Sequence, residues 1–501
     1  MSNQLIDAPA HEAPLDPNDW TELRVLAHRM VDDMLGFLED VRERPVWQPM
    51  PESVTTRFQG PVPIEAEGLA RAYDDFRSDV LTYPLGNIHP RFWGWVIGSG
   101  LPVGMLAEML AAGMNPNLGG ASHAANLVEA QVLSWFKELL GFPAEASGVL
   151  VSGGSIANLV GLTVARNARA EIDLRRYGVA ASPRPMTLYA STETHSSIQR
   201  AVEILGLGRE ALRLIPCGSD FRIDLAALAD TLAADRAAGR LPFCVVGNAG
   251  TTNTGAIDDL AGLARICAEE KLWFHVDGAF GALAALSPTL RPALDGMERA
   301  DSVAFDLHKW FYLPIGIGGV LVRDEAAHRG AFTLTPDYLR HAERGPAAGE
   351  RWFSDYGPEL SRPFRALKVW LALKTHGAAA FGRAIDENVE QAHYLAALVS
   401  VAPDLELLAP VALNIVCFRY RVAELTGAAL DDLNQELLLR LQESGVALPS
   451  NTTVHGRYGL RVAITNHRSR HDDFDLLVSE VRRLGQDVEA AMRGAASATT
   501  A

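Results

Sequence analysis

Residues 301–313 read Asp-Ser-Val-Ala-Phe-Asp-Leu-His-Lys-Trp-Phe-Tyr-Leu. An apolar run typical of a buried strand ends here, and His308 and Lys309 follow it directly, before three aromatic residues. Burial among aromatic side chains favours the neutral amine of a lysine, which is the form that attacks a carbonyl carbon. The pattern therefore predicts a nucleophilic Lys309, although a surface lysine after a buried strand has the same local sequence.

A second strand-like run lies upstream at 272–276, and Asp277, Gly278 and Ala279 follow it. An aspartate after one strand and a lysine after another are the groups that pyridoxal phosphate requires. The carboxylate keeps the pyridine nitrogen protonated, and the lysine binds the aldehyde as a Schiff base. Asp277 alone could equally cap a helix, but together with Lys309 it favours the cofactor interpretation.

The composition is that of an ordinary globular protein with a large core. The 501 residues are 48% hydrophobic and 21% charged, which is enough chain for two or three domains. A net charge of −16 argues against nucleic acid or an anionic membrane as the main partner. The sequence shows neither a signal-peptide pattern nor an apolar stretch long enough to span a membrane, so we expect a cytoplasmic protein.

The cysteines are scattered and form no CxxC pair. They are Cys217, Cys244, Cys267 and Cys417. We expect small core residues in a reducing compartment, with no disulfide framework, no zinc site and no other metal.

Strand-like and helix-like stretches alternate over about 180 residues in the middle of the chain. The predicted strands are 149–151, 187–190, 213–216, 243–246, 273–276, 302–305 and 319–322. The predicted helices between them are 156–170, 196–207, 224–237 and 258–269. This alternation predicts an α/β fold with a mostly parallel seven-stranded sheet, helices on both faces, and ligands at the carboxyl ends of the strands.

The flanking segments predict two further units. Apolar residues recur at helical spacing over 20–44, after a polar stretch that we expect to be disordered. Residues 101–113 and 126–140 indicate buried helices. Farther along, the predicted helices are 365–376, 378–400, 428–444 and 472–492, and the predicted strands are 413–420 and 459–465. The predicted domain limits are 1–95 for a helical N-terminal segment, 96–365 for the large domain, 366–493 for a small α+β domain and 494–501 for a disordered tail.

A glycine-rich turn joins a strand to a helix at 152–158, which read Ser-Gly-Gly-Ser-Ile-Ala-Asn. The backbone N–H of Gly154 and the hydroxyl of Ser155 are suited to hold a phosphate at the helix N-terminus. The stretch is neither a Walker loop nor a GxGxxG motif, and a plain turn before a helix is the alternative.

Polar residues also follow two other predicted strands. Thr-Glu-Thr-His-Ser-Ser at 192–197 places His195 where a flat imidazole can stack on a cofactor ring, or where it simply begins a helix. Gly-Thr-Thr-Asn-Thr-Gly at 250–255 offers Thr252 to a ligand, or forms a turn. Both stretches fall where parallel sheets bind their ligands.

The order and spacing of these motifs resemble the group II pyridoxal phosphate decarboxylases, the family of aromatic L-amino acid, histidine and glutamate decarboxylases. The resemblance spans about residues 80–485. Its motifs lie at 152–155, 194–197, 250–252, 275–279 and 308–310. It implies a fold type I enzyme with pyridoxal 5'-phosphate as its cofactor.

The resemblance also implies where each residue stands around that cofactor. Lys309 would form the Schiff base, Asp277 would pair with the pyridine nitrogen, and His195 would stack on the ring. The remaining cofactor contacts are implied for Gly154, Ser155, Thr252, Ala279 and His308.

A catalytic loop and a dimer follow from the same resemblance. The stretch 333–361 matches the family's mobile loop, in which Tyr338 is the candidate proton donor. Arg362 matches a position near the substrate carboxylate. The family is a homodimer whose helical N-terminal segment lies on the partner, which fits the apolar face of 20–44.

The expected substrate pocket departs from the aromatic decarboxylases. Beside Trp95, the small residues Val96 and Gly98 stand where that family has larger or hydroxylated ones, so we expect a pocket of different shape. Ser361 is serine as in the histidine-type enzymes and could meet a polar side chain. His123 could do the same, or form a structural hydrogen bond.

The sequence therefore predicts decarboxylation of an L-amino acid, with an aromatic or polar side chain, to the amine and CO2. One alternative is decarboxylation-dependent oxidative deamination to an aldehyde, which a phenylalanine in place of Tyr338 would favour. The other is a catalytically silent cofactor-binding scaffold, which the presence of Lys309, Asp277 and Tyr338 argues against. The residues do not identify the amino acid.

Overall fold

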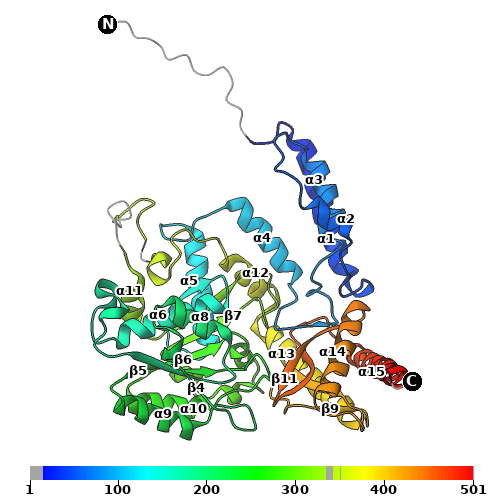
Figure 1. Cartoon of the computed structure of the whole chain (residues 1–501). Coiled ribbons are helices and arrows are strands. Elements are labelled where there is room, and N and C mark those ends of the chain that lie inside the picture. The colour runs from blue at the N-terminus through cyan, green and yellow to red at the C-terminus, as the bar shows by residue number, and fades with distance from the viewer. Residues whose placement is uncertain (1–14, 335–341, 350, 500–501) are drawn as a thin grey trace. The chain divides into compact units, whose positions relative to one another are not determined.

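A computed structural model describes residues 15–334, 342–349 and 351–499, with side chains as far as residue 494 (Figure 1). Contacts divide the chain into two compact units, Met1–Arg44 with Met50–Tyr83, and Pro45–Pro49 with Pro84–Ala501. Within the described part of the chain, no helix is both long enough and apolar enough to cross a membrane.

The first unit is helical. Its longest helix, α1 (Trp20–Glu39), begins where the Asp19 carboxylate accepts the N–H groups of Thr21 and Glu22. The shorter elements are η1 (Val41–Glu43), α2 (Glu52–Arg57), α3 (Leu69–Asp75) and η2 (Phe76–Val80). The predicted helix over 20–44 therefore ends at Glu39. Phe37 of its apolar face is buried, and most of the other residues of that face are partly exposed.

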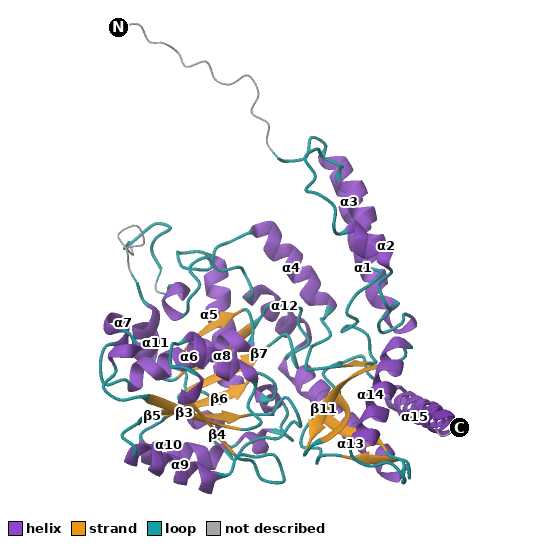
Figure 2. Ribbon diagram, in the orientation of Figure 1, coloured by secondary structure: helices purple, strands orange, loops and turns teal. Residues whose placement is uncertain are grey.

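The second unit contains the predicted sheet. Its seven strands lie in the order β2-β8-β7-β6-β5-β3-β4, and β8 alone runs opposite to the other six. The orange arrows labelled β3 to β7 in Figure 2 belong to this sheet. The strands are β2 (Ser147–Val151), β3 (Met186–Ser191), β4 (Leu212–Ile215), β5 (Leu241–Asn248), β6 (Trp273–Gly278), β7 (Ser302–Asp306) and β8 (Gly318–Val322). The mostly parallel seven-stranded sheet predicted from the sequence is confirmed, strand for strand.

Helices cover the sheet, and β6 shows how its side chains divide between the faces. His275 and Asp277 face α6, where both bond Asn158, and Phe274 points to the opposite face because side chains alternate along a strand. The helices of this region are α6 (Gly154–Arg169), α7 (Leu174–Tyr177), α8 (Ser196–Ile204), α9 (Leu225–Ala237), α10 (Leu260–Glu270) and α11 (Glu325–Phe332).

The two helices that were predicted to be buried differ from each other in how much of their surface the chain covers. The helix α5 (Ala124–Leu139) is buried along one face, as expected. The helix α4 (Pro102–Met114) buries only Gly104 and Ala107. Its large apolar side chains face outward, so the prediction of a buried helix is wrong for α4 within this chain.

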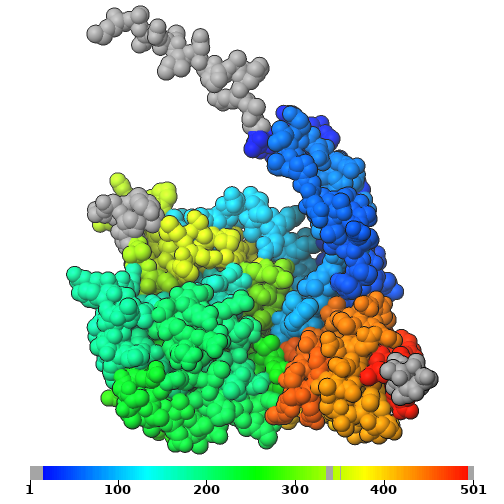
Figure 3. Space-filling model, in the orientation of Figure 1, coloured from blue at the N-terminus to red at the C-terminus, as the bar shows by residue number. Residues whose placement is uncertain are grey.

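The C-terminal part has its own sheet, in the order β1-β11-β12-β10-β9. Its elements are β1 (Phe92–Trp93), β9 (Leu405–Leu407), β10 (Ile415–Tyr420), β11 (Leu448–Val454), β12 (Arg457–Ala463), α12 (Ala366–His376), α13 (Ala378–Val401), α14 (Ala428–Glu443) and α15 (His471–Thr499). Its surface adjoins the larger lobe in the space-filling view (Figure 3). The disordered tail predicted from 494 differs from the structure, in which α15 continues to Thr499.

Two histidines are fully buried in this unit, and we expect them to make the fold sensitive to acid. Burial lowers the pKa of both His275 and His328 to about 4. Below the ordinary histidine pKa of about 6.5, each of these histidines binds a proton in the unfolded chain but not in the folded one. As the pH is lowered, the free energy of unfolding therefore falls by about 1.4 kcal/mol per pH unit for each histidine. Thermal unfolding should show a falling midpoint between pH 6.5 and 5, before most carboxylates titrate. A constant midpoint over that range would contradict this.

Candidate active site

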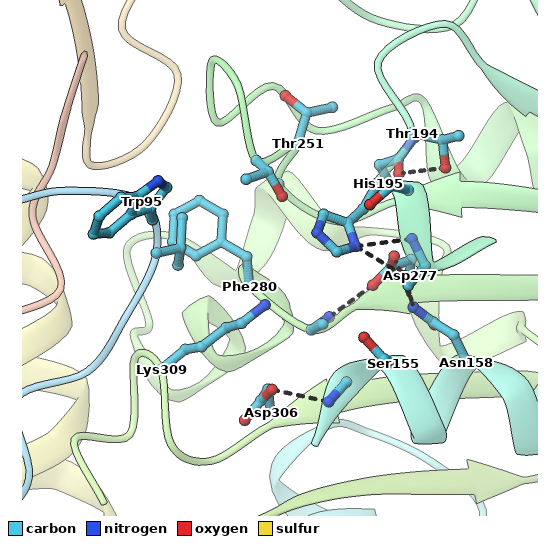
Figure 4. A pocket seen from close by; sticks show the side chains of 18 of the residues that line it. Trp95, Ser155, Asn158, Thr194, His195, Thr251, Asp277, Phe280, Asp306 and Lys309 are labelled. Carbon is cyan, nitrogen blue, oxygen red and sulfur yellow. Dashed lines mark hydrogen bonds between the residues drawn. The ribbon is translucent and has the colours of Figure 1, made fainter. Parts of the chain in front are cut away.

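A cavity of about 790 Å³ lies at the carboxyl ends of the parallel strands (Figure 4). Lys309 enters it from the turn after β7, Asp277 from β6, Thr252 from the turn after β5, and His195 from the turn after β3. The other predicted site residues that line it are Trp95, Val96, Gly154, Ser155, Ala279 and His308. Parallel strands that end at one edge of a sheet thus bring together residues from distant parts of the chain.

Lys309 faces this cavity and is half-buried. Its aromatic neighbours do not line the cavity. Trp310 and Tyr312 donate to the Asn388 side chain at 3.1 and 2.8 Å, and Phe311 is fully buried. The sequence argument that these rings enclose the amine is therefore wrong, because they anchor the turn in the core and leave the amine in the cavity.

Asp277 has a buried carboxylate with a donor on each oxygen. The Asn158 side chain donates to Oδ2 at 2.9 Å, and the backbone N–H of Ala279 donates to Oδ1 at 3.1 Å. The side chain of Asp277 nevertheless reaches the cavity, as Figure 4 shows. A fixed carboxylate of this kind can hold a proton on a ring nitrogen of a bound molecule.

His195 is the N-cap of α8, and its ring lines the cavity. Its Nδ1 accepts the backbone N–H of Ser197 at 3.2 Å. Burial lowers the pKa of His195, and this effect outweighs the attraction of the Asp277 carboxylate for a proton. A neutral, flat imidazole therefore faces the cavity.

The N-terminus of α6 forms an anion-binding cradle. A Cβ on Gly153 would lie 2.9 Å from His308 Cε1, and one on Gly154 would lie 2.7 Å from Ala279 Cβ, so neither site accepts a side chain without a shift. Ser155 and His308 line the cavity at this helix N-terminus, where the helix dipole favours an anion.

Asp306, which the sequence analysis did not single out, lies beside this cradle. Its Oδ2 accepts the N–H of Gly154 at 2.9 Å, and its Oδ1 accepts both the backbone N–H and Nδ1 of His308, at 3.0 and 2.8 Å. The carboxylate thus fixes the His308 ring against the helix N-terminus.

Arg461 on β12 is the second residue that sequence reasoning missed. It is 4% exposed, lines the cavity, and donates to the backbone carbonyls of Trp95, Thr252 and Asn253. Burial lowers the pKa of Arg461 to about 10, so it stays cationic at neutral pH. No carboxylate of the described residues forms an ion pair with it. A charged residue inside the apolar strand 459–465 was the signal available in the sequence.

Trp95 is held in an uncommon backbone conformation. Its φ of 52° lies in the left-handed region, and its carbonyl accepts a guanidinium N–H of Arg461 at 3.0 Å. Non-glycine residues in this region occur preferentially at functional sites. The conformation presents the Trp95 side chain to the cavity mouth.

Three predicted substrate contacts do not line this cavity, and two of them, Arg362 and Gly98, are packed inside the fold. Arg362 is 3% exposed, and its guanidinium bonds the Glu129 carboxylate at 2.5 Å and the carbonyls of Leu118 and Leu150. A Cβ on Gly98 would lie 2.4 Å from the Lys309 carbonyl oxygen. Arg362 is therefore a buried structural cation, and Gly98 is small because the backbone that carries Lys309 packs on it.

Ser361 lies elsewhere, in a second hollow of about 370 Å³ that His123 also lines. His123 Nε2 contacts the Asn117 carbonyl oxygen at 3.1 Å, which is a structural hydrogen bond. Tyr338, with the rest of 335–341, lies outside the described residues. Among the residues that are described, no group of three or more His, Cys, Asp or Glu side chains is arranged to hold a metal ion.

The cavity provides a lysine amine, a buried carboxylate, a flat neutral ring and an anion cradle, and these groups fit pyridoxal phosphate. The family model for the pyridoxal-dependent decarboxylase conserved domain matches residues 51–421. The aromatic-L-amino-acid decarboxylase of Bacillus atrophaeus is 34% identical over 471 residues, which cover 93% of this chain and 96% of that protein.

Two further relatives show the range of the family. The phenylacetaldehyde synthase of Arabidopsis thaliana is 30% identical, over 90% of this chain and 93% of that protein. The crystal structure of Oryza sativa TDC with PLP and tryptamine matches with a TM-score of 0.87 at 27% identity, over 95% of this chain and 99% of that one. The chain therefore belongs to the pyridoxal-dependent decarboxylases, carboxy-lyases whose cofactor is pyridoxal phosphate.

Proposed function

We propose that this protein converts an L-amino acid with an aromatic or polar side chain to the amine and CO2. The observation that carries the proposal is that Lys309, Asp277 and the unpaired cation Arg461 line one cavity. Pyridoxal phosphate, when bound, accepts the electrons released as the carboxylate carbon leaves. The residues of the chain supply the attachment, the charge and the orientation.

Each residue has a separate task in this proposal. Lys309 attaches the cofactor, and Asp277 keeps a proton on its pyridine nitrogen. Arg461, which donates to backbone carbonyls and has no acidic partner among the described residues, supplies the positive charge that attracts a carboxylate of the amino acid. Trp95 and Val96 form the apolar wall beside it.

A panel of L-amino acids tests this assignment. The purified, cofactor-loaded protein is incubated with each amino acid, and the amine and CO2 are measured together by mass spectrometry. We expect equal amounts of the two from at least one aromatic or polar amino acid. Loss of substrate without CO2 would overturn the proposed function.

Tyr338 is proposed as the group that delivers a proton to Cα after CO2 has left. Tyr338→Phe keeps the ring and removes the donor, so amine formation should fall by about 10²- to 10⁴-fold, the usual contribution of a general acid. Dioxygen would then compete for the unprotonated product, and aldehyde, ammonia and hydrogen peroxide should appear. Amine formation at the wild-type rate without peroxide would exclude Tyr338 as the donor.

Oxidative deamination is the second candidate function, because one relative is named phenylacetaldehyde synthase. The tyrosine at 338 favours decarboxylation, since the oxidative reaction needs protonation to be suppressed. Peroxide in amounts equal to the aldehyde from the unmodified protein would favour the second candidate.

We also propose that the protein is a homodimer in which α4 lies in the interface. The apolar residues that α4 exposes are Leu106, Met109, Leu110 and Met114. A patch of this kind is characteristic of a surface that a partner covers.

Charges placed on α4 should therefore separate the subunits. The double variant Met109→Glu with Leu110→Glu should elute as a monomer in size exclusion with light scattering, because two buried carboxylates would be left unpaired in the interface. Leu439→Glu on α14, also at an exposed leucine, is the matched control and should leave the dimer intact. A double variant that remains dimeric would exclude α4 from the interface.

A further inference from the structure

A continuous chain of buried polar side chains runs beneath the cavity, between the sheet and α6. Its members are each at most 6% exposed. They are Trp273, His275 and Asp277 on β6, Ser302 on β7 and Asn158 on α6. A Cβ on Gly161 would lie 2.6 Å from His275 Cε1, so α6 packs directly on this layer and closes it from solvent.

The hydrogen bonds of this chain run in one direction. The Trp273 indole N–H donates to Ser302 Oγ at 2.8 Å, and Ser302 Oγ lies 2.8 Å from His275 Nδ1. His275 Nε2 lies 2.9 Å from Asn158 Oδ1, which can only accept. The imidazole must therefore donate from Nε2, and as a neutral ring it accepts the Ser302 hydroxyl at Nδ1.

Asn158 continues this series of hydrogen bonds to residues that line the cavity. Its amide nitrogen donates to Asp277 Oδ2 at 2.9 Å and to Ser197 Oγ at 3.1 Å. Since the carboxylate can only accept, the partner of Asn158 Nδ2 and the partner of its Oδ1 both require the same orientation of the amide. Ser197 Oγ lies 2.9 Å from His195 Nδ1, which already accepts the Ser197 backbone N–H. The His195 proton is therefore on Nε2.

We propose that His275 is a positioning residue, which holds the Asn158 amide so that both of its N–H groups serve the site. One N–H orients the Asp277 carboxylate, and the other, through Ser197, sets the tautomer of His195. The inference rests on the proposed function, in which Asp277 keeps a proton on the cofactor's pyridine nitrogen and His195 lies on its ring.

The opposite orientation of the Asn158 amide shows why the N–H donor of His275 matters. Without it, rotation of the Asn158 amide would turn Oδ1 toward the Asp277 carboxylate, acceptor against acceptor. The carboxylate would lose one of its two N–H partners, and its direction would no longer be fixed.

Two carboxamide variants separate this role from simple core packing. His275→Gln can place its amide nitrogen where Nε2 stands, and so keeps the donor to Asn158. His275→Asn is shorter and matches Nδ1 instead, so it keeps the bond to Ser302 and loses the one to Asn158. Both replace the ring by a polar group of the same kind, and a purely structural histidine would be affected alike by either change.

The readout is the ¹⁵N chemical shift of labelled cofactor bound to the full-length protein, which reports whether the pyridine nitrogen is protonated. We expect His275→Asn to move the shift toward the unprotonated value and to lower kcat by about ten- to a hundredfold, as hydrogen-bond partners behind a reacting group do. His275→Gln should restore both toward wild type. Wild-type shifts in both variants, or equal changes in both, would overturn the proposal.

Asn158→Leu is the second test, in case the histidine variants do not fold. The change keeps nearly the same size, adds no charge and removes both N–H donors, so the cofactor shift should again move toward the unprotonated value. An unchanged shift would overturn the proposal. The shift is measured without substrate, so a protein that turns over no amino acid would contradict the proposed function and leave this readout intact.

Discussion

Replacing Lys309 by alanine is expected to abolish turnover and the visible absorption band of a lysine-bound cofactor. Lys309 is the lysine that lines the 790 Å³ cavity among the described residues, and no neighbouring amine can take its place. Its removal leaves the cradle at Gly154 and the carboxylate of Asp277, so the cofactor should still bind without the covalent bond.

Absorption spectra, equilibrium binding of the cofactor and product analysis check this result. Lys374→Ala is the matched control, because the Lys374 amine lies over the Trp370 ring on α12, away from the cavity. The control should keep the band and full activity. Persistence of the band in Lys309→Ala would show that another lysine binds the cofactor.

Replacing Asp277 by alanine is expected to lower the rate by several orders of magnitude. An unprotonated pyridine is a poor acceptor of electrons, and the Asp306 carboxylate, which also lines the cavity, is held by the N–H groups of Gly154 and His308. Asp277→Asn, which keeps the shape and one hydrogen-bond acceptor, should be almost as slow because it cannot hold the proton.

The measurement is the single-turnover rate at saturating cofactor, compared with the midpoint of thermal unfolding. Glu193→Gln is the control, because Glu193 also lines the cavity but no role is assigned to it. A rate for Asp277→Ala near that of the wild type would remove Asp277 from the reaction.

The large sheet was predictable because its strands are short, continuous apolar runs buried on both faces, such as 243–246 and 319–322. The positions of Asp277, His195 and Lys309 followed from the same pattern, because each residue stands just after or at the end of a parallel strand. Local sequence was sufficient there, since topology alone brings these ends to one edge.

Features that depend on distant contacts were not predictable. Arg362 pairs with Glu129, which is far away in the sequence, and the ion pair is visible only once α5 has packed against that segment. The strand β11 reads Leu-Pro-Ser-Asn-Thr-Thr-Val, has no apolar run, and forms because β12 pairs with it. Gly98 looked like room for a substrate, but it contacts the backbone of His308 and Lys309.

The chain of buried polar side chains beneath the cavity could not be predicted from the sequence for a related reason. Asn158 and His275 both stood in motifs that the sequence analysis quoted, yet their partnership requires α6 to lie on β6. Arg461 is likewise recruited from the C-terminal sheet to a cavity built by the other one. The sequence pattern of one segment does not show which distant segments will contact it.

The most direct test of the account is reduction of the cofactor-loaded protein with borohydride, followed by peptide mapping. Reduction fixes the cofactor to the amine that holds it. The other lysines of the chain are Lys137, Lys271, Lys368 and Lys374, and among the described residues none of these lines the cavity. The account predicts that the mass of the reduced phosphopyridoxyl group is found on the peptide that contains Lys309. Its presence on one of the other four lysines, or on none, would contradict the account.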